Sequence, residues 1–433
     1  MSYSIRPVVG AVALALACSG ALAGPAKKVA AKPAESTATP VKFELAHTLD
    51  AANESRLQGI VDRFNKESGN NLTLVRQEKG AKPAELNFLL RDDKTDLLGH
   101  SGDYAALYAV MAKAGETKQL RDLSGDLKSG VVDGKGRLVA LPVLYSTPVL
   151  FYNKNAFRKA GLNPDQPPGT WLEMQAMLDK LQDAGYACPY TSSWPVWVHV
   201  DNVSALSGVP AATDKGQLTF NGLPQVKHIA MMATWTKANY FKLFGRRNEA
   251  SQQFHEGQCA MITTDSREYV DFQDAKGVEL GVAALPYHDD VYGGRQSTLA
   301  DGASLWIGAG RTTAQYKQIA RFVSFVLSPE IQVELTRIYG GLPLTEAARV
   351  AAQSKLMRDG EKTLEVAYAS LKGNGSKSAV RVANIDPVSV VTNEELEAVW
   401  ADKKPAKAAL DTSVNRGNGL LVAQPTLKKT QPF

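Results

Sequence analysis

Residues 141–153 read Leu141-Pro-Val-Leu-Tyr-Ser-Thr-Pro-Val-Leu-Phe-Tyr-Asn153, a long apolar and extended run that contains two prolines. Proline cannot donate a hydrogen bond to a neighbouring strand, so central strands of a sheet rarely contain it. A strand that leaves one domain and enters another has this pattern. We therefore expect the chain to pass between two domains within this run.

Strands and helices alternate on both sides of the run. Residues 43–46 and 72–76 have the pattern of strands, and residues 51–66 between them carry apolar side chains at helical spacing. Strand, helix and strand with short connections form the unit of a mostly parallel sheet. We also expect a strand at 96–99 and helices at 104–114, 155–160, 170–181, 224–240, 314–327 and 405–421.

The length of the chain points to more than one domain. The 433 residues exceed what a single hydrophobic core usually organises. Together with the alternation of strands and helices, this length predicts an α/β protein with two domains. We find no internal repeat in the sequence.

The first residues have the pattern of a secretory signal peptide. Arg6 precedes an apolar run that ends in small residues before Ala23, and this run is too short for the ~20 residues of a membrane-spanning helix. We expect residues 1–23 to be removed and residues 24–40, rich in Ala, Pro and Lys, to form a flexible leader. Lipid attachment at Cys18 is the alternative. The chain is thus predicted to be exported to the periplasm.

Charge and cysteine content exclude some functions. The net charge of +5 comes from 49 basic and 44 acidic residues spread along the chain, so nucleic acid is not an expected partner. After export only Cys188 and Cys259 remain. In an oxidising compartment they can form a disulfide, stabilising the fold by about 4 kcal/mol, or they can stay as two buried thiols.

The sequence lacks the common catalytic motifs. It has no metalloprotease motif, nucleophile elbow or phosphate-binding loop, and its six histidines are not spaced as metal ligands. His228 fits the exposed face of a helix. We therefore predict that the protein is not an enzyme and holds no metal or cofactor.

Two irregular segments offer groups for a ligand. Trp194 and Trp197 lie in a proline-containing loop, where indole rings can pack on a sugar or polyol, unless at least one of them belongs to the core instead. Asp301 and Gly302 precede an apolar strand, where glycine permits close approach of a ligand. An ordinary turn is the alternative there.

Longer segments carry a family resemblance. The stretch from Ser146 to Trp171 resembles the hallmark of family 1 extracellular solute-binding proteins of ABC importers. Four further blocks, at residues 225–231, 302–306, 394–400 and 409–421, resemble the branch that binds sn-glycerol 3-phosphate. The likeness extends over residues 41–423 and its blocks follow the family's order.

The resemblance implies a fold and a mechanism. Two α/β lobes joined by hinge strands would close around a small polar solute in the cleft between them. We expect residues 41–148 with about 300–345 to form the N-terminal lobe, residues 149–299 with about 346–423 to form the C-terminal lobe, and residues 424–433 to form a tail. A monomer would deliver the solute to permease subunits in the inner membrane, which are driven by a separate ATPase.

The resemblance also implies ligand-binding residues. Positions that match the family's pattern are Ser146, Trp194, Trp197 and Gly302, to which Asp103 and either Asp265 or Ser266 are added as near matches. The phosphate end departs from the family, because Gly341, Ser389 and Lys82 stand where the family has Tyr, Arg and Tyr. Lys82, Arg295 or Arg381 would have to replace the lost arginine.

The sequence leaves more than one function open. The first is a binding protein for sn-glycerol 3-phosphate or a glycerophosphodiester, and the second is the same transport role with a neutral polyol or sugar. The lost arginine and the carboxylate of Asp265 weigh against a phosphate. The third is a secreted hydrolase, and the fourth is a sensing protein without a role in transport.

Overall fold

The computed structural model describes residues 41–78, 81–90, 101–128, 130–133, 135–213, 216–290, 294–356, 358–372 and 386–421. The predicted signal peptide, leader and tail, the strand expected at 96–99 and Arg381 lie outside these residues. Among the described helices, none is both long and apolar enough to cross a membrane.

The first sheet follows the order β2-β1-β3-β11-β4, and β5 also pairs with β11. Strands β1, β2 and β3 are parallel, whereas β11 is antiparallel to β3, β4 and β5. The strands are β1 (Lys42–His47), β2 (Asn71–Arg76), β3 (Leu86–Leu89), β4 (Tyr104–Ala105), β5 (Leu141–Ser146) and β11 (Asp301–Gly308).

The second sheet follows the order β10-β6-β9-β7-β8. Strand β6 is antiparallel to β9 and β10, and β7 is parallel to β8 and β9. The strands are β6 (Pro148–Asn153), β7 (Cys188–Ser192), β8 (Phe241–Lys242), β9 (Cys259–Asp265) and β10 (Leu280–Ala284). The run that was predicted to change domain therefore does change sheet, at Thr147 between β5 and β6.

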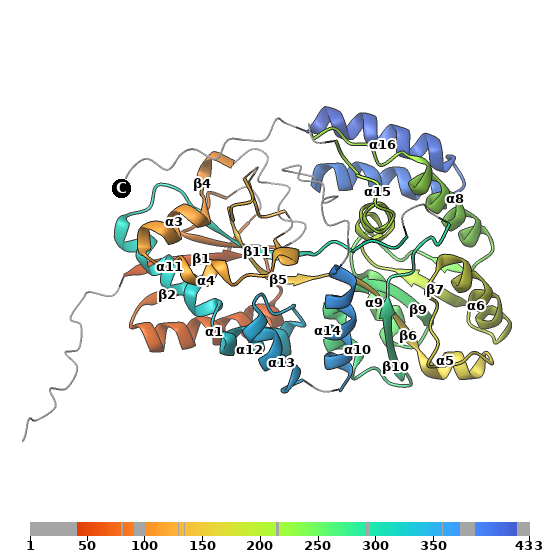
Figure 1. The fold of residues 1–433 in the computed structure, drawn as a ribbon, viewed down its shortest axis with the longest axis horizontal. Helices are drawn as coiled ribbons and strands as arrows, with labels where there is room; N and C mark the ends of the chain where they lie inside the picture. Colours follow the sequence, from red (N-terminus) through yellow and green to blue (C-terminus); the bar gives the residue numbers. More distant parts are fainter. Residues whose placement is uncertain are drawn as a thin grey trace, which may run out of the picture. The chain divides into compact units, whose positions relative to one another are not determined.

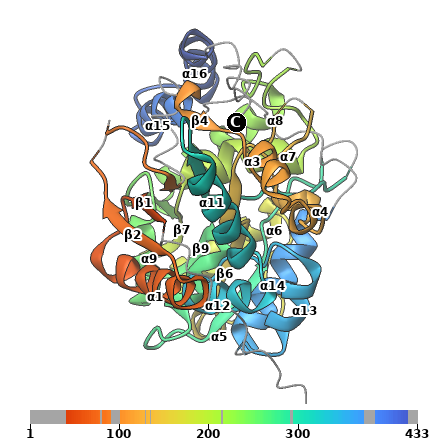
Figure 2. The same cartoon turned by 90° about the vertical axis from the view of Figure 1, so that its left-hand side faces the viewer.

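Helices surround each sheet (Figure 1). They are α1 (Ala51–Ser68), α3 (Leu107–Ala114), α4 (Lys118–Arg121), α5 (Lys154–Lys159), α6 (Trp171–Asp183), α7 (Val203–Leu206), α8 (Leu223–Lys237), α9 (Glu249–His255), α10 (Tyr269–Phe272), α11 (Thr313–Val326), α12 (Pro329–Tyr339), α13 (Glu346–Gln353), α14 (Arg358–Leu371), α15 (Asp386–Trp400) and α16 (Ala406–Leu420). The last two lie side by side in both views (Figures 1 and 2). Short 3₁₀ turns span Ser101–Asp103 (η2), Gly125–Leu127 (η3) and Ser266–Glu268 (η5), and Trp197–Asn202 forms a π-helix (η4).

Local sequence explains several helix starts. Asp50 caps α1 by accepting a hydrogen bond from the Asn53 N–H, and Thr170 opens α6 with a complete capping box. The helix expected from Tyr104 is shorter than predicted, because Tyr104 and Ala105 pair with β11 and α3 begins only at Leu107. Helix α16 begins directly after Pro405.

Each sheet has its own hydrophobic core. Aromatic side chains from β1, α1 and α11 meet in the first, where the ring centroid of Phe64 lies 5.0 Å from that of Phe322. Trp171, Tyr190 and Trp235 are buried together in the second. Two sheets with separate cores place strand ends from both around Thr147.

Candidate functional site

The carboxyl ends of β7 and β9 bring polar residues of the second sheet together. The two strands are parallel, and Ser192 stands opposite Thr263 near their ends. In open α/β sheets, ligands bind beyond the carboxyl ends of the strands. The segments that begin with Ser193 after β7 and with Ser266 after β9 are therefore candidates for ligand contact.

Residues of the first sheet meet these segments at Thr147. Ser146 ends β5, pairs with Asp301 at the start of β11, and donates its hydroxyl to the Asp301 carbonyl at 3.3 Å. Ser266 donates its backbone N–H to the Thr147 carbonyl at 3.0 Å, and its hydroxyl accepts the Thr147 N–H at 3.4 Å. Three residues predicted from sequence, Ser146, Ser266 and Asp301, thus converge on one crossing point.

Asp265 and Arg267 form an ion pair beside this crossing. The buried carboxylate of Asp265 accepts the Arg267 backbone N–H at 3.0 Å and its Nη2 at 2.9 Å. Sequence analysis identified Asp265 but missed Arg267. The available signal was a cation two residues after an acid at the end of a strand.

Sequence analysis also missed Glu268, the buried acidic residue next to Arg267. Burial, and then the charges of Asp265 and Asp271, raise the pKa of Glu268 to about 8, while Ser251 lowers it through a hydrogen bond. The hydroxyl of Ser251 lies 3.2 Å from that of Ser193. A buried polar path therefore connects the segment after β9 to the segment after β7.

Gly302 is required by its own sheet. A Cβ atom at this position would lie 1.9 Å from the carbonyl oxygen of Leu144 in β5. Gly302 is a strand residue rather than part of a turn, so the close approach that the glycine permits is that of β5. The neighbouring Gly340, with φ of 71°, brings the turn before Gly341 against the backbone of Arg267.

The two tryptophans differ in their surroundings. Trp197 is 7% exposed and belongs to the core of the second sheet, which is the outcome that the sequence left open for at least one of them. Trp194 is partly buried and has a φ of 52°, which is uncommon outside glycine. The backbone N–H of Trp194 donates to the carbonyl of Arg247 at 2.9 Å. Contact of either ring with a ligand stays a prediction.

Three further predicted residues have their own surroundings in the described structure. Asp103 is exposed in η2, and its carbonyl accepts the Ala309 N–H at 2.6 Å. Ser389 is partly buried in α15. The guanidinium of Arg295 lies 5.7 Å from the ring centroid of Tyr287. The contacts described here for Asp103 and Arg295 do not involve the crossing point.

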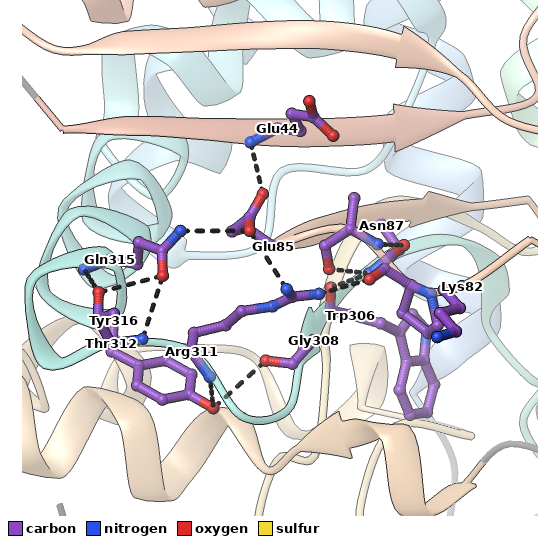
Figure 3. Close-up of polar contacts among 12 residues, drawn as sticks. Glu44, Lys82, Glu85, Asn87, Trp306, Gly308, Arg311, Thr312, Gln315 and Tyr316 are labelled. Carbon is purple, nitrogen blue, oxygen red and sulfur yellow. Dashed lines mark hydrogen bonds and ion pairs between the residues drawn. The ribbon is translucent and has the colours of Figure 1, made fainter.

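Lys82 lines a separate polar pocket of about 440 Å³ on the first sheet. Glu85 also lines this pocket, and it accepts the Glu44 N–H at 2.9 Å and pairs with Arg311 at 3.3 Å (Figure 3). Gln315 also donates to Glu85, at 3.2 Å. Because Glu85 and Arg311 are engaged with the protein itself, we assign these pairings to holding the segment before β3 onto α11.

Cys188 and Cys259 form a disulfide between β7 and β9, where the two residues stand directly opposite each other. The bond joins the two strands whose carboxyl ends carry Ser193 and Ser266. It therefore stabilises the base of the candidate site.

The interpretation of His228 as a surface residue is wrong. His228 is fully buried, and its Nε2 and Nδ1 lie 2.9 Å from His199 Nδ1 and 3.1 Å from His288 Nε2. Burial lowers the pKa of His199 to about 3 and that of His288 to about 4. Among the described residues, no group of three or more His, Cys, Asp or Glu is arranged to hold a metal ion.

Sequence comparison relates the chain to periplasmic transport proteins. Residues 59–361 match the family model of the bacterial extracellular solute-binding proteins. The sn-glycerol-3-phosphate-binding periplasmic protein UgpB of Pectobacterium atrosepticum is 33% identical over 97% of this chain and 96% of its own. The protein of the same name from Yersinia enterocolitica is 38% identical over 66% of this chain and 67% of its own.

Structural comparison confirms the predicted fold. The UgpB structure from Mycobacterium tuberculosis in complex with glycerophosphocholine has a TM-score of 0.72 at 18% identity, over 88% of this chain and 98% of the other. A ribitol-bound ABC transporter solute-binding protein from Agrobacterium radiobacter has a TM-score of 0.70 at 17% identity, over 88% of this chain and 100% of the other. The α/β arrangement is thus that of periplasmic binding proteins. The chain belongs to the bacterial extracellular solute-binding protein family.

Proposed function

We propose that the protein is the periplasmic component of an ABC importer and captures a small polar solute at the Thr147 crossing. The observation that carries this proposal is the convergence of Ser146 and Asp301 from the first sheet with Ser266 from the second. A solute bound to these residues would contact both sheets at once. Family membership and the periplasmic names of the relatives support the same role.

Capture would proceed by closure of two lobes. We place residues 41–148 with about 300–345 in one lobe and residues 149–299 with about 346–423 in the other, so the chain crosses between lobes near Thr147, near residue 300 and near residue 345. A ligand that contacts both lobes favours the closed form. To shift such an equilibrium fully, it must favour that form by about 5 kcal/mol. The closed form would then dock on the permease.

The same site does not support a hydrolase. The Ser146 hydroxyl donates to a backbone carbonyl, and the Asp265 carboxylate is held by Arg267, so neither group is set up as a nucleophile or general base. His199 is engaged by His228 and Tyr190 within the core. We therefore propose binding without bond cleavage.

The solute belongs to one of two chemical classes. The names of the relatives and the complex of the M. tuberculosis protein favour glycerol 3-phosphate or a glycerophosphodiester. The ribitol-bound neighbour favours a neutral polyol or sugar. Both classes carry hydroxyl groups that Ser146 and Ser266 can bind.

Export, partners and assembly follow from this role. We propose that residues 1–23 direct the chain to the periplasm and are removed, and that the mature chain works as a monomer with separate permease and ATPase subunits. Lipid attachment at Cys18 would instead tether the chain to the membrane. Mass spectrometry of the exported protein distinguishes cleavage before Gly24 from a lipidated Cys18.

Calorimetric titration of the exported protein tests the function. The panel contains sn-glycerol 3-phosphate, glycerophosphocholine, ribitol and maltose, and small-angle scattering measures compaction on binding. At least one solute is expected to bind with a Kd of about 10 μM or tighter and to compact the protein. Ser146→Ala should weaken that binding about tenfold.

Ser354→Ala is the matched control, because Ser354 is exposed and also donates to a backbone carbonyl, that of Ala351. It should leave binding unchanged. Turnover of a phosphodiester or glycoside, or the absence of any compacting solute, would contradict the proposed function.

A further inference from the structure

The Asp265–Arg267 pair has a fully buried carboxylate and a partly exposed arginine side chain. The Asp265 side chain has no exposed surface, whereas 24% of the Arg267 side chain is exposed. Hydrogen bonds from Arg267 to other described residues use its backbone N–H, Nε and Nη2, and none uses Nη1. The accessible part of the pair therefore belongs to Arg267, whose guanidinium already has its counter-ion.

The pair lies at the proposed solute site. Asp265 stands opposite Pro148, one residue from Thr147, and Ser266 between the two partners bonds to Thr147 directly. Burial lowers the pKa of Arg267, but the charges of Asp265, Glu268 and Asp301 and the hydrogen bond to Asp265 raise it overall. The same guanidinium thus interacts with carboxylates from both β9 and β11.

The charges next to the pair disfavour an anion. An arginine binds phosphate strongly when its planar fork is free to make two parallel hydrogen bonds. Here Asp265 uses the Nε and Nη2 edge of the guanidinium and neutralises its charge, and the charge of Asp301 also acts on Arg267. A phosphate would therefore gain little attraction from Arg267, while hydroxyl groups can bond to its remaining N–H groups as neutral partners.

On the basis of the proposed function, we propose that Arg267 and Asp265 are specificity-determining residues that select a neutral polyhydroxylated solute over a phosphate ester. Arg267 contacts the hydroxyl groups of the solute. Asp265 orients the guanidinium and, by neutralising it, excludes phosphate. Ser146 and Ser266 supply further hydroxyl contacts on either side of Thr147.

Calorimetry with sn-glycerol 3-phosphate on the wild-type protein and on Asp265→Asn tests this selection. The wild type should bind the phosphate ester with a Kd in the millimolar range or weaker, and Asp265→Asn should bind it at least about tenfold more tightly because the guanidinium is released. Glu279→Gln is the matched control. It breaks the exposed Arg158–Glu279 pair, whose atoms lie 2.6 Å apart, and should not change phosphate binding.

A second variant, Arg267→Gln, and the binding of sn-glycerol 3-phosphate by the wild type complete the test. Arg267→Gln should weaken binding of whichever neutral probe, ribitol or maltose, binds the wild type, and circular dichroism monitors folding of each variant. Micromolar binding of sn-glycerol 3-phosphate by the wild type overturns the selection while leaving solute capture intact. A folded Asp265→Asn protein that gains no phosphate affinity also overturns it. If no probe binds or compacts the wild type, both the selection and the proposed function fail.

Discussion

The hydroxyl groups of Thr147 and Thr298 lie 2.6 Å apart and join the two segments that precede β6 and β11. Both side chains are buried, and Thr147 Oγ1 also lies 3.0 Å from the Leu299 carbonyl. Leu299 in turn donates its N–H to Asn202 Oδ1 at 2.8 Å. These two chain segments are thus bonded to each other and to the π-helix that carries Trp197.

Removing this bond should destabilise the protein. Thr147→Val keeps the shape of the side chain and leaves the Thr298 hydroxyl with one partner fewer, so we expect a loss of about 1 kcal/mol in the free energy of unfolding. Urea denaturation measures the loss. Thr73→Val, at an exposed position of β2, should change stability by less than about 0.5 kcal/mol. Equal effects at the two positions would contradict the assignment.

Substitution of Gly302 tests the close approach of β5 and β11. In Gly302→Ala the added Cβ would overlap the Leu144 carbonyl, so the strands must separate, and we expect a loss of about 2 kcal/mol or more. Gly59→Ala has open space within α1 and should stabilise the protein by about 0.5–1 kcal/mol. Thermal melts that moved in the same direction for both variants would be inconsistent with the structure.

The disulfide should contribute strongly to stability. Its cysteines are separated by 71 positions, and closing a loop of that length contributes about 4 kcal/mol in the chain-entropy model. The double variant Cys188→Ala with Cys259→Ala should lose about 2–4 kcal/mol of unfolding free energy. Reduction of the wild type should lower its denaturation midpoint similarly, while the double variant should not respond to the reductant. A wild type insensitive to reduction would show that the bond is not formed.

Glu268 should make the protein less stable at high pH. Its pKa is raised from an ordinary 4.5 to about 8, so folding favours the protonated carboxyl. The resulting stabilisation is complete below about pH 4.5 and is lost as the pH rises to about 8. In Glu268→Gln this part of the pH dependence should disappear, whereas Glu256→Gln, at an exposed site, should retain it. Denaturation midpoints measured from about pH 5 to 9 provide the comparison.

The buried histidines should make the protein less stable at low pH. Their folded-state pKa values lie below the ordinary 6.5, with His199 at about 3 and His228 lowered chiefly by burial. The neutral rings therefore stabilise the fold above about pH 6.5, and this contribution is lost as the pH falls toward about 3. Histidine ring NMR signals of His199 and His228 should stay in the neutral form at about pH 5. Protonation of either ring near its ordinary pKa of about 6.5 would contradict their burial.

Local sequence patterns were sufficient for much of the fold. The strand at residues 42–47 and the helix after it were predictable because alternation and helical spacing of apolar residues are properties of short segments. The change of sheet at Thr147 was predictable for a similar reason, since the two prolines limit what the run can pair with. The start of α3 at Leu107, instead of the expected Tyr104, was not predictable, because Tyr104 and Ala105 pair with the distant β11.

The site depended more on tertiary structure. Ser146, Asp265, Ser266 and Asp301 could be named from the sequence, but their convergence required two sheets to end at one crossing. The ion pair between Arg267 and Asp265 could be recognised only from its geometry in the structure. The burial of His228 likewise depends on the elements that pack around it. Residue types and short-range spacing thus determined the elements and the candidate groups. Contacts between residues far apart in the chain decided which groups meet and which charges are already neutralised, because burial and pairing depend on neighbours that no local segment contains.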